Sequence, residues 1–107
     1  MAAETRFELI YAVETIDHLD VIERKYHRLI ETAIAQQLRH TPEHITRNRK
    51  PLEQPGPFGA TWELRFGPNN RFRVFYDVNK QEQTVEILAI GIKERHQLLI
   101  GKEEYGQ

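Results

Sequence analysis

Three strand-like segments follow one another between residues 62 and 92, and only short turns separate them. Residues 62–66 alternate apolar and charged side chains, and Gly67-Pro68-Asn69-Asn70 then forms a tight turn before the strand-like segment 71–78. A second turn at 79–83 leads into segment 84–92, where residues 87–90 are all apolar. Because short hairpin turns place consecutive strands side by side, these segments predict a hairpin-rich sheet whose strand 84–92 is central and covered on both faces.

A further strand and one long helix are predicted ahead of these segments. Phe7, Leu9 and Tyr11 share one face of a strand over 7–11. Apolar residues then recur at steps of three and four from 19 to 38, which predicts an amphipathic helix with Thr15 or Asp17 as its N-cap. Pro42 should end this helix and begin one further short helical turn at 41–43.

The remaining segments are expected to be less regular. Proline and glycine in the connector over 46–59 argue against regular structure there, and the polar tail over 93–107 should dock through Leu98, Leu99 and Ile100. The predicted order is therefore β-α-(short α)-β-β-β, a two-layer α+β fold with the long helix packed on one face of the sheet. At 107 residues the chain has the size of one ordinary domain, which we place at 1–107.

Composition excludes several classes of site. The chain has no cysteine, so disulfides, thiolate nucleophiles, zinc fingers and iron–sulfur clusters are excluded. His40 and His44 have a metal-ligand spacing, but Pro42 breaks the helical face between them, and we expect no metal and no cofactor. No apolar run approaches the roughly 20 residues of a membrane helix, and the N-terminus lacks the pattern of a signal peptide. We therefore expect a cytoplasmic protein without a membrane partner.

The charge of the chain is unevenly distributed. Fifteen Lys and Arg oppose sixteen Asp and Glu, which gives a net charge of −1. Residues 47–77 nevertheless carry six Lys and Arg against three Asp and Glu, a net charge of +3 between acidic flanks. A near-neutral protein therefore contains a basic segment, and binding of anions depends on this local distribution as well as on the total.

Two arginines in this basic segment are candidates for an anion site. Arg65 and Arg73 alternate with apolar residues on neighbouring predicted strands, so both should stand on the open face of the sheet, where two guanidinium groups suit a phosphate. Further cations could close the same patch: Lys93, Arg95 and His96 after the last strand, and Arg47, Arg49 and Lys50 from the connector. The alternative is that these are ordinary solvated charges, some of them paired with Glu63 or Asp77.

Aromatic residues on the same strands have two interpretations. Trp62, Phe75 and Tyr76 could form a platform on which bases stack, as in RNA-binding sheets. Within the strands of a small domain such residues are more often part of the core, which is the interpretation we favour.

The strand Arg71-Phe-Arg-Val-Phe-Tyr-Asp-Val78 and the following Ile87-Leu-Ala-Ile-Gly-Ile-Lys93 resemble the RelE/ParE superfamily of bacterial toxin–antitoxin toxins. The similarity extends to segments 46–52, 62–67 and 98–103 and so spans nearly the whole chain. It implies the RelE-like fold and a cognate antitoxin partner. RelE-type members cut mRNA in the ribosomal A site, whereas ParE-type members inhibit DNA gyrase.

The resemblance to RelE also implies roles for individual residues. It assigns phosphate binding and catalysis, as an mRNA interferase without a metal, to Arg73, Arg65, Lys93 and His96, with further contacts to RNA from Arg95, Lys50, Arg49 and Arg71. Two features depart from the nuclease pattern. Glu63 stands where active members prefer lysine, and the only tyrosine near the C-terminus is Tyr105. The alternatives are therefore a ParE-like gyrase inhibitor and a degenerate, non-toxic homologue that binds only an antitoxin.

Overall fold

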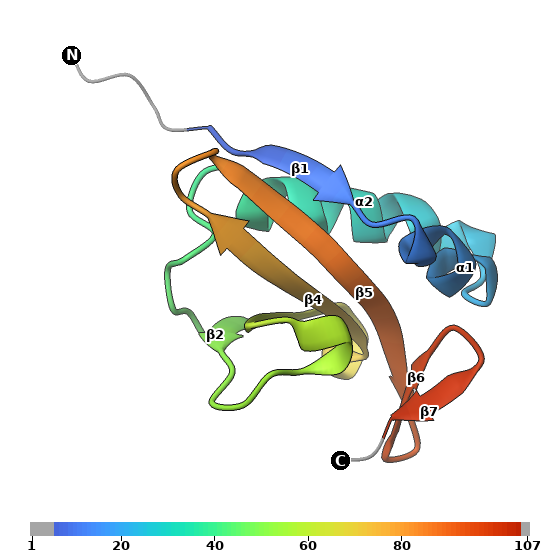
Figure 1. Cartoon of the computed structure of the whole chain (residues 1–107). Coiled ribbons are helices and arrows are strands. Elements are labelled where there is room, and N and C mark those ends of the chain that lie inside the picture. The colour runs from blue at the N-terminus through green and yellow to red at the C-terminus, as the bar shows by residue number, and fades with distance from the viewer. Residues whose placement is uncertain (1–5, 106–107) are drawn as a thin grey trace.

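The computed structural model describes residues 6–105; residues 1–5 and 106–107, the two ends of the predicted domain 1–107, lie outside the described part. One seven-stranded sheet carries two α-helices (Figure 1). The elements in chain order are β1 (Glu8–Tyr11), α1 (Glu14–Asp20), the 3-10 turn η1 (Arg24–Tyr26), α2 (His27–Leu38), β2 (Arg49–Pro51), η2 (Pro57–Gly59), β3 (Trp62–Phe66), η3 (Pro68–Asn70), β4 (Phe72–Asn79), β5 (Thr84–Glu94), β6 (Gln97–Ile100) and β7 (Glu103–Tyr105).

The sheet is mainly antiparallel, as the sequence predicts. Strands β2 to β7 follow one another in spatial order, and each pairs antiparallel with the next. The first strand, β1, instead pairs parallel with the start of β5, at 84–87, while β6 pairs with its end, at 91–94 (Figure 1). The long strand β5 therefore pairs with β4 along one edge and with β1 and β6 along the other, which confirms its predicted central position.

A bulge in β5 explains its unbroken apolar run. The pairing of β4 with β5 shifts between Phe75 and Tyr76, which lie opposite Ala89 and Ile87, so Leu88 is the extra residue. Such a bulge inverts the alternation of side chains along the strand. Ile87 before the bulge and Ile90 after it consequently belong to the same core cluster.

The larger part of the core lies between α2 and the sheet. Ile30, Ile34 and Leu38 on α2 are fully buried and belong to one cluster with Leu64 and Val74 of the sheet. This packing confirms that the apolar stripe of the helix covers one face of the sheet, as Figure 1 shows for α2. The opposite face has a smaller apolar cluster, formed by Ala60, Phe75, Ala89 and Ile100.

The prediction of one long helix is wrong, because the chain breaks between α1 and α2. Glu23 has an extended backbone (φ −54°, ψ 136°). The two helices bury different surfaces: α1 directs Thr15 and His18 inward, and His18 Nδ1 accepts a hydrogen bond of 3.2 Å from the backbone N–H of Ile90 in β5. A single straight helix could not make this contact and at the same time place the residues of α2 across the sheet. Among residues 6–105, no helix is long and apolar enough to cross a membrane.

The predicted caps and the short helix after Pro42 also need correction. Helix α1 begins at Glu14, so neither Thr15 nor Asp17 is its N-cap, and Thr15 Oγ1 instead donates to the carbonyl of Ala12 at 2.6 Å. Residues 41–44 form a single turn closed by a bond of 3.2 Å from the N–H of His44 to the carbonyl of Thr41. A fully buried Tyr76 donates its hydroxyl to the Pro42 carbonyl at 2.7 Å and so fixes this turn to the sheet.

Two segments predicted to be irregular contain strands. Within the connector, β2 pairs with β3 at the edge of the sheet, where Pro51 can be accommodated because its missing N–H is not needed by a further strand. In the tail, β6 and β7 form a hairpin that extends the sheet beyond β5. The hairpin buries Ile100, which confirms that the apolar tail residues dock against the domain.

Candidate functional site

Arg65 and Arg73 lie directly opposite each other on β3 and β4. Their neighbours Leu64 and Val74 face α2, so the alternation of the strands places both arginines on the opposite face of the sheet. Arg73 is 8% exposed, and its Nε donates to the carbonyl of Asn70 at 2.9 Å. The hairpin that the sequence predicts thus brings these two guanidinium groups together as expected.

Glu63 lies between the two arginines. Its Oε1 is 3.2 Å from Arg65 Nη2, and its Oε2 is 3.4 Å from Arg73 Nη1, so each carboxylate oxygen contacts one guanidinium group. The side chains of Glu63 and Arg73 are only 6% and 9% exposed, whereas that of Arg65 is 37% exposed. The pairing with Glu63 that the alternative includes is therefore confirmed, but Arg73 is buried and is not an ordinary solvated charge. Asp77 instead accepts hydrogen bonds from Thr61, from the N–H at 2.8 Å and the hydroxyl at 2.7 Å.

The arginine pair lines an open groove of about 710 Å³. The groove also contains three of the other predicted site residues, namely Lys50 of β2, Lys93 of β5 and His96 of the β5–β6 turn. Four cationic side chains thus face one carboxylate, Glu63, along the same hollow. We refer to this hollow as the basic groove.

Apolar side chains form part of the wall of the basic groove. Phe75, Leu98 and Tyr105 line it, and Tyr105 comes from β7, a strand that sequence analysis did not predict. An anion bound to the cations would therefore lie beside a half-buried aromatic ring. The sequence gives no periodic signal that places Tyr105 here, since residues 98–100 are all apolar and residues 102–104 are all charged.

Burial changes the acidity of Arg73. Loss of solvent around its guanidinium group lowers the pKa of Arg73, and the nearby positive charge of Arg65 acts in the same direction. Glu63 raises the pKa again through its charge and its hydrogen bond. Arg73 is thus a charge held in a poorly solvated position, where its interaction with a second anion would be strong.

Arg49, Arg71 and Arg95 lie outside the basic groove. Arg49 is opposite Leu64 in the β2–β3 ladder and so points to the face that carries α2. There its Nη1 donates to the carbonyls of Gln37, at 2.6 Å, and of Thr41, which fixes the C-terminal end of α2. Lys50, one residue later, is opposite Glu63 and lines the groove.

Arg71 and Arg95 are positioned by other contacts. The guanidinium carbon of Arg71 lies 5.4 Å from the ring centre of Tyr26, and its Nη2 is 3.2 Å from Glu94 Oε2. Arg95 is exposed in the turn between β5 and β6, where both Arg95 and His96 have positive φ angles, of 56° and 93°. This turn directs His96, but not Arg95, into the groove.

Tyr76 and Trp62 belong to the core, as predicted. Tyr76 is fully buried, and the ring of Trp62 stacks on it with centroids 5.9 Å apart and an interplanar angle of 20°. Phe75 is also buried, at 3% exposure, but on the face of the basic groove. The strands thus supply one core aromatic residue to the groove wall and leave no exposed stacking platform at these three positions.

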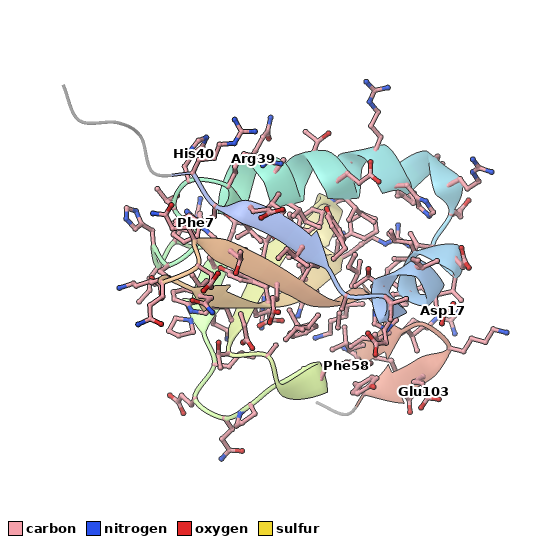
Figure 2. The ribbon with its side chains drawn as sticks, turned by 45° about the horizontal axis from the view of Figure 1, so that its top comes forward. Phe7, Asp17, Arg39, His40, Phe58 and Glu103 are labelled. Carbon is pink, nitrogen blue, oxygen red and sulfur yellow. The ribbon has the colours of Figure 1, made fainter. Side chains whose placement is uncertain are left out.

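A second hollow of about 640 Å³ lies between α1, η2 and the β6–β7 hairpin. Figure 2 shows its lining residues Asp17, Phe58 and Glu103 at the same end of the molecule. Its wall also contains His18, whose ring contacts that of Phe58 edge to face at 5.2 Å between centroids. This hollow is acidic and contains none of the predicted site residues, so the basic groove remains the candidate site.

Comparison with known proteins supports the fold alone. No family model matches the sequence, and no curated protein is significantly similar to it. Among solved structures, the fold is similar to that of a chain of the toxin–antitoxin complex RelBE2 from Mycobacterium tuberculosis, with a TM-score of 0.61 and 21% sequence identity. The similarity covers 82% of this chain and 99% of that chain. The predicted RelE-like fold is therefore confirmed.

Proposed function

We propose that this chain is the toxin of a bacterial toxin–antitoxin pair and that it cleaves ribosome-bound mRNA in the basic groove. The observation that carries the proposal is the groove itself: Arg65, Arg73, Lys93 and His96 come from three strands and the β5–β6 turn and line one hollow. The fold that this chain shares with a chain of a toxin–antitoxin complex supports the same conclusion.

The arrangement of these residues fits cleavage by the 2′-hydroxyl of the RNA. In that reaction the 2′-oxygen attacks the adjacent phosphorus while the bond from phosphorus to the 5′-oxygen of the next nucleotide breaks. A base takes the proton of the 2′-hydroxyl, and an acid returns a proton to the departing 5′-oxygen. Negative charge accumulates on the phosphoryl oxygens, and fixed cations stabilise it.

Each residue has a role that its position supports. Arg73 and Arg65 would hold the phosphoryl oxygens, because paired guanidinium groups match the geometry of a phosphate. Lys93 adds positive charge at the end of β5. His96 would transfer the proton, since an imidazole ring can both accept and donate one and the β5–β6 turn brings this ring into the groove. Lys50 would contact a neighbouring phosphate, and Tyr105 would stack on a base.

The proposal is tested by expressing the chain alone in a bacterial host and mapping the 5′ ends of cleaved mRNA. We expect growth arrest and cuts that require translation. Arg65→Ala should strongly reduce both, whereas Arg28→Ala, a change of an exposed arginine on α2, should reduce neither. Growth arrest without new mRNA ends would contradict the nuclease assignment.

A toxin without nuclease activity is the second candidate, and the position of Glu63 favours it. A carboxylate between the two arginines weakens the attraction of the groove for RNA, because contacts to phosphate dominate such binding. The chain would then either inhibit DNA gyrase, as ParE-type toxins do, or be a homologue that has lost its toxicity. Supercoiling by purified gyrase is measured at a saturating concentration of the chain, and inhibition would favour the gyrase target. Expression in a host that leaves growth unaffected would favour the non-toxic homologue.

The proposal includes an antitoxin as the partner. Apolar side chains that are exposed in this chain, Ile10 and Tyr11 on β1 and Val13 and Ile16 around the start of α1, offer it a surface to cover. Co-expression of the product of a neighbouring reading frame should suppress toxicity and co-purify with the chain. A neighbouring gene product that does neither would remove this part of the proposal.

A further inference from the structure

Glu63 is placed where an anionic ligand of the arginine pair would bind. Its carboxylate lines the basic groove and contacts Arg65 and Arg73 through separate oxygens, at 3.2 Å and 3.4 Å. Two guanidinium groups that share one carboxylate in this way present the same geometry that they would present to two oxygens of a phosphate. The free protein thus already holds an anion between its two arginines.

The three charges are not fully satisfied by one another. Arg65 Nε is buried and has no hydrogen-bond partner among residues 6–105. Arg73 uses Nε for the carbonyl of Asn70 and Nη1 for Glu63, at the long distance of 3.4 Å. Buried donors without partners carry a free-energy cost, so an anion that supplies more acceptor oxygens than Glu63 would improve this arrangement.

From these contacts we propose that Glu63 is an internal counter-ion that competes with phosphate for Arg65 and Arg73 and so sets a low affinity of the groove for RNA. This inference rests on the proposed function, because it takes the groove to be the site for RNA phosphate. It adds that the resting protein blocks its own site and that tight binding requires displacement of Glu63 or additional contacts elsewhere on the ligand. Glu63 is in this account an affinity-determining residue and takes no part in proton transfer.

The test measures binding of a short 2′-O-methyl RNA, which lacks the attacking hydroxyl, to the purified full chain over a range of salt concentrations. Glu63→Gln should bind the RNA about tenfold more tightly than the wild type. The wild type must break the charged hydrogen bonds between Glu63 and the arginines when RNA binds, whereas the variant does not have this cost. The slope of log affinity against log salt should become more negative by about 0.7, the value for one additional phosphate contact to a single strand. A role in packing alone would leave this slope unchanged.

Glu82→Gln is the matched control, because Glu82 is exposed in the turn between β4 and β5 and its substitution changes the net charge by the same amount. Equal affinity and salt slope for Glu63→Gln, Glu82→Gln and the wild type would overturn the proposal. If Glu63→Gln does not fold, Glu63→Asp tests the proposal instead. Its side chain is one methylene shorter, which withdraws the carboxylate from the arginines and should raise the affinity for RNA several-fold. An unchanged affinity would overturn the proposal.

The same experiment separates this inference from the proposed function. Non-cleavable RNA reports on binding without ribosomes or catalysis. Tighter binding by Glu63→Gln in a protein that cuts no mRNA would support the counter-ion and remove the nuclease. Cleavage by the wild type together with unchanged binding by Glu63→Gln would support the nuclease and remove the counter-ion.

Discussion

Arg65 and Arg73 are directly opposed residues of antiparallel strands, and the carboxylate of Glu63 lies within 3.4 Å of both guanidinium groups. Like charges at opposed positions of a ladder destabilise a sheet. Glu63 offsets this repulsion here through its contacts with both guanidinium groups. The opposed arginines therefore lower the stability of the sheet and at the same time form a site suited to phosphate.

Replacement of Arg73 by lysine tests whether the forked guanidinium group is required. A lysine keeps the charge but cannot hold the Asn70 carbonyl, Glu63 and a phosphate at the same time. We expect Arg73→Lys to reduce mRNA cleavage by about 100-fold, as when one donor to a transition state is lost. Arg28→Lys should match the wild type. Growth arrest as strong for Arg73→Ala as for the wild type would contradict the assignment.

Truncation of the α2 core should cost stability. Ile34 is fully buried against the sheet, so Ile34→Ala should lower the free energy of unfolding by about 2–5 kcal/mol in urea titrations. Leu29 on the same helix is 42% exposed, and Leu29→Ala should cost less than about 1 kcal/mol. Equal effects of the two substitutions would be inconsistent with the packing of α2 described above.

Stability should fall in mild acid because of His18. Burial lowers the pKa of His18 below its ordinary value of 6.5, while Glu14 and Asp17 oppose this shift. The unfolded chain therefore takes up a proton first, and stability that is present above pH 6.5 decreases as the pH falls toward the lower folded pKa. The neutral ring also accepts the N–H of Ile90, which a proton on Nδ1 would prevent.

The measurement for His18 is the melting temperature between pH 5 and pH 8. His18→Gln keeps an acceptor near Ile90 but does not titrate, so its melting temperature should depend less on pH than that of the wild type. His44→Gln, at an exposed position, is the control and should leave the slope unchanged. Identical slopes for the wild type and His18→Gln would refute the contribution of His18.

Gly91 is predicted to determine how closely β6 approaches β5. A Cβ at this position would lie 2.9 Å from the carbonyl oxygen of Leu99 and 3.0 Å from Cγ1 of Ile100. Gly91→Ala should therefore displace β6, lower the free energy of unfolding by about 1–3 kcal/mol and reduce mRNA cleavage by moving His96. Unfolding and cleavage assays check this, and a Gly91→Ala variant with the stability and the cleavage rate of the wild type would contradict it.

The sequence predicted the arginine pair because its signals are local. The alternation over 62–66 and 71–78 determines which face each residue occupies, and the short turn between them determines the register. Arg65 and Arg73 follow from these two facts alone. The central position of β5 was predicted from its apolar run, although the bulge at Leu88 also contributes to that run.

Other parts of the site depend on long-range pairing, which the sequence did not reveal. The strand β2 has only three residues, and its pairing with β3 sends Lys50 to the groove and Arg49 to α2. Tyr105 lines the groove because β7 pairs with β6 at the end of a polar tail. Short polar strands of this kind have weak intrinsic preferences, and tertiary packing decides their structure.

The break between α1 and α2 was missed for a related reason. The apolar spacing from residue 19 to residue 38 suits one continuous helix, and no proline or glycine interrupts it. The interruption at Glu23 lets α1 and α2 pack on different surfaces, and α1 makes contacts that are distant in sequence, such as the bond between His18 and Ile90. Helix periodicity therefore predicted which residues are buried better than where the helices end.

The most direct test of the central claim is an assay with purified ribosomes programmed with a defined mRNA. The wild-type chain should cut the mRNA in the A site within minutes and leave the same mRNA intact when ribosomes are omitted. Arg65→Ala should reduce the rate by about 100-fold while keeping the wild-type melting temperature, because Arg65 is the more exposed of the two arginines. Equal cleavage rates for wild type and Arg65→Ala, or no cleavage by the wild type, would contradict the account of the basic groove as a nuclease site.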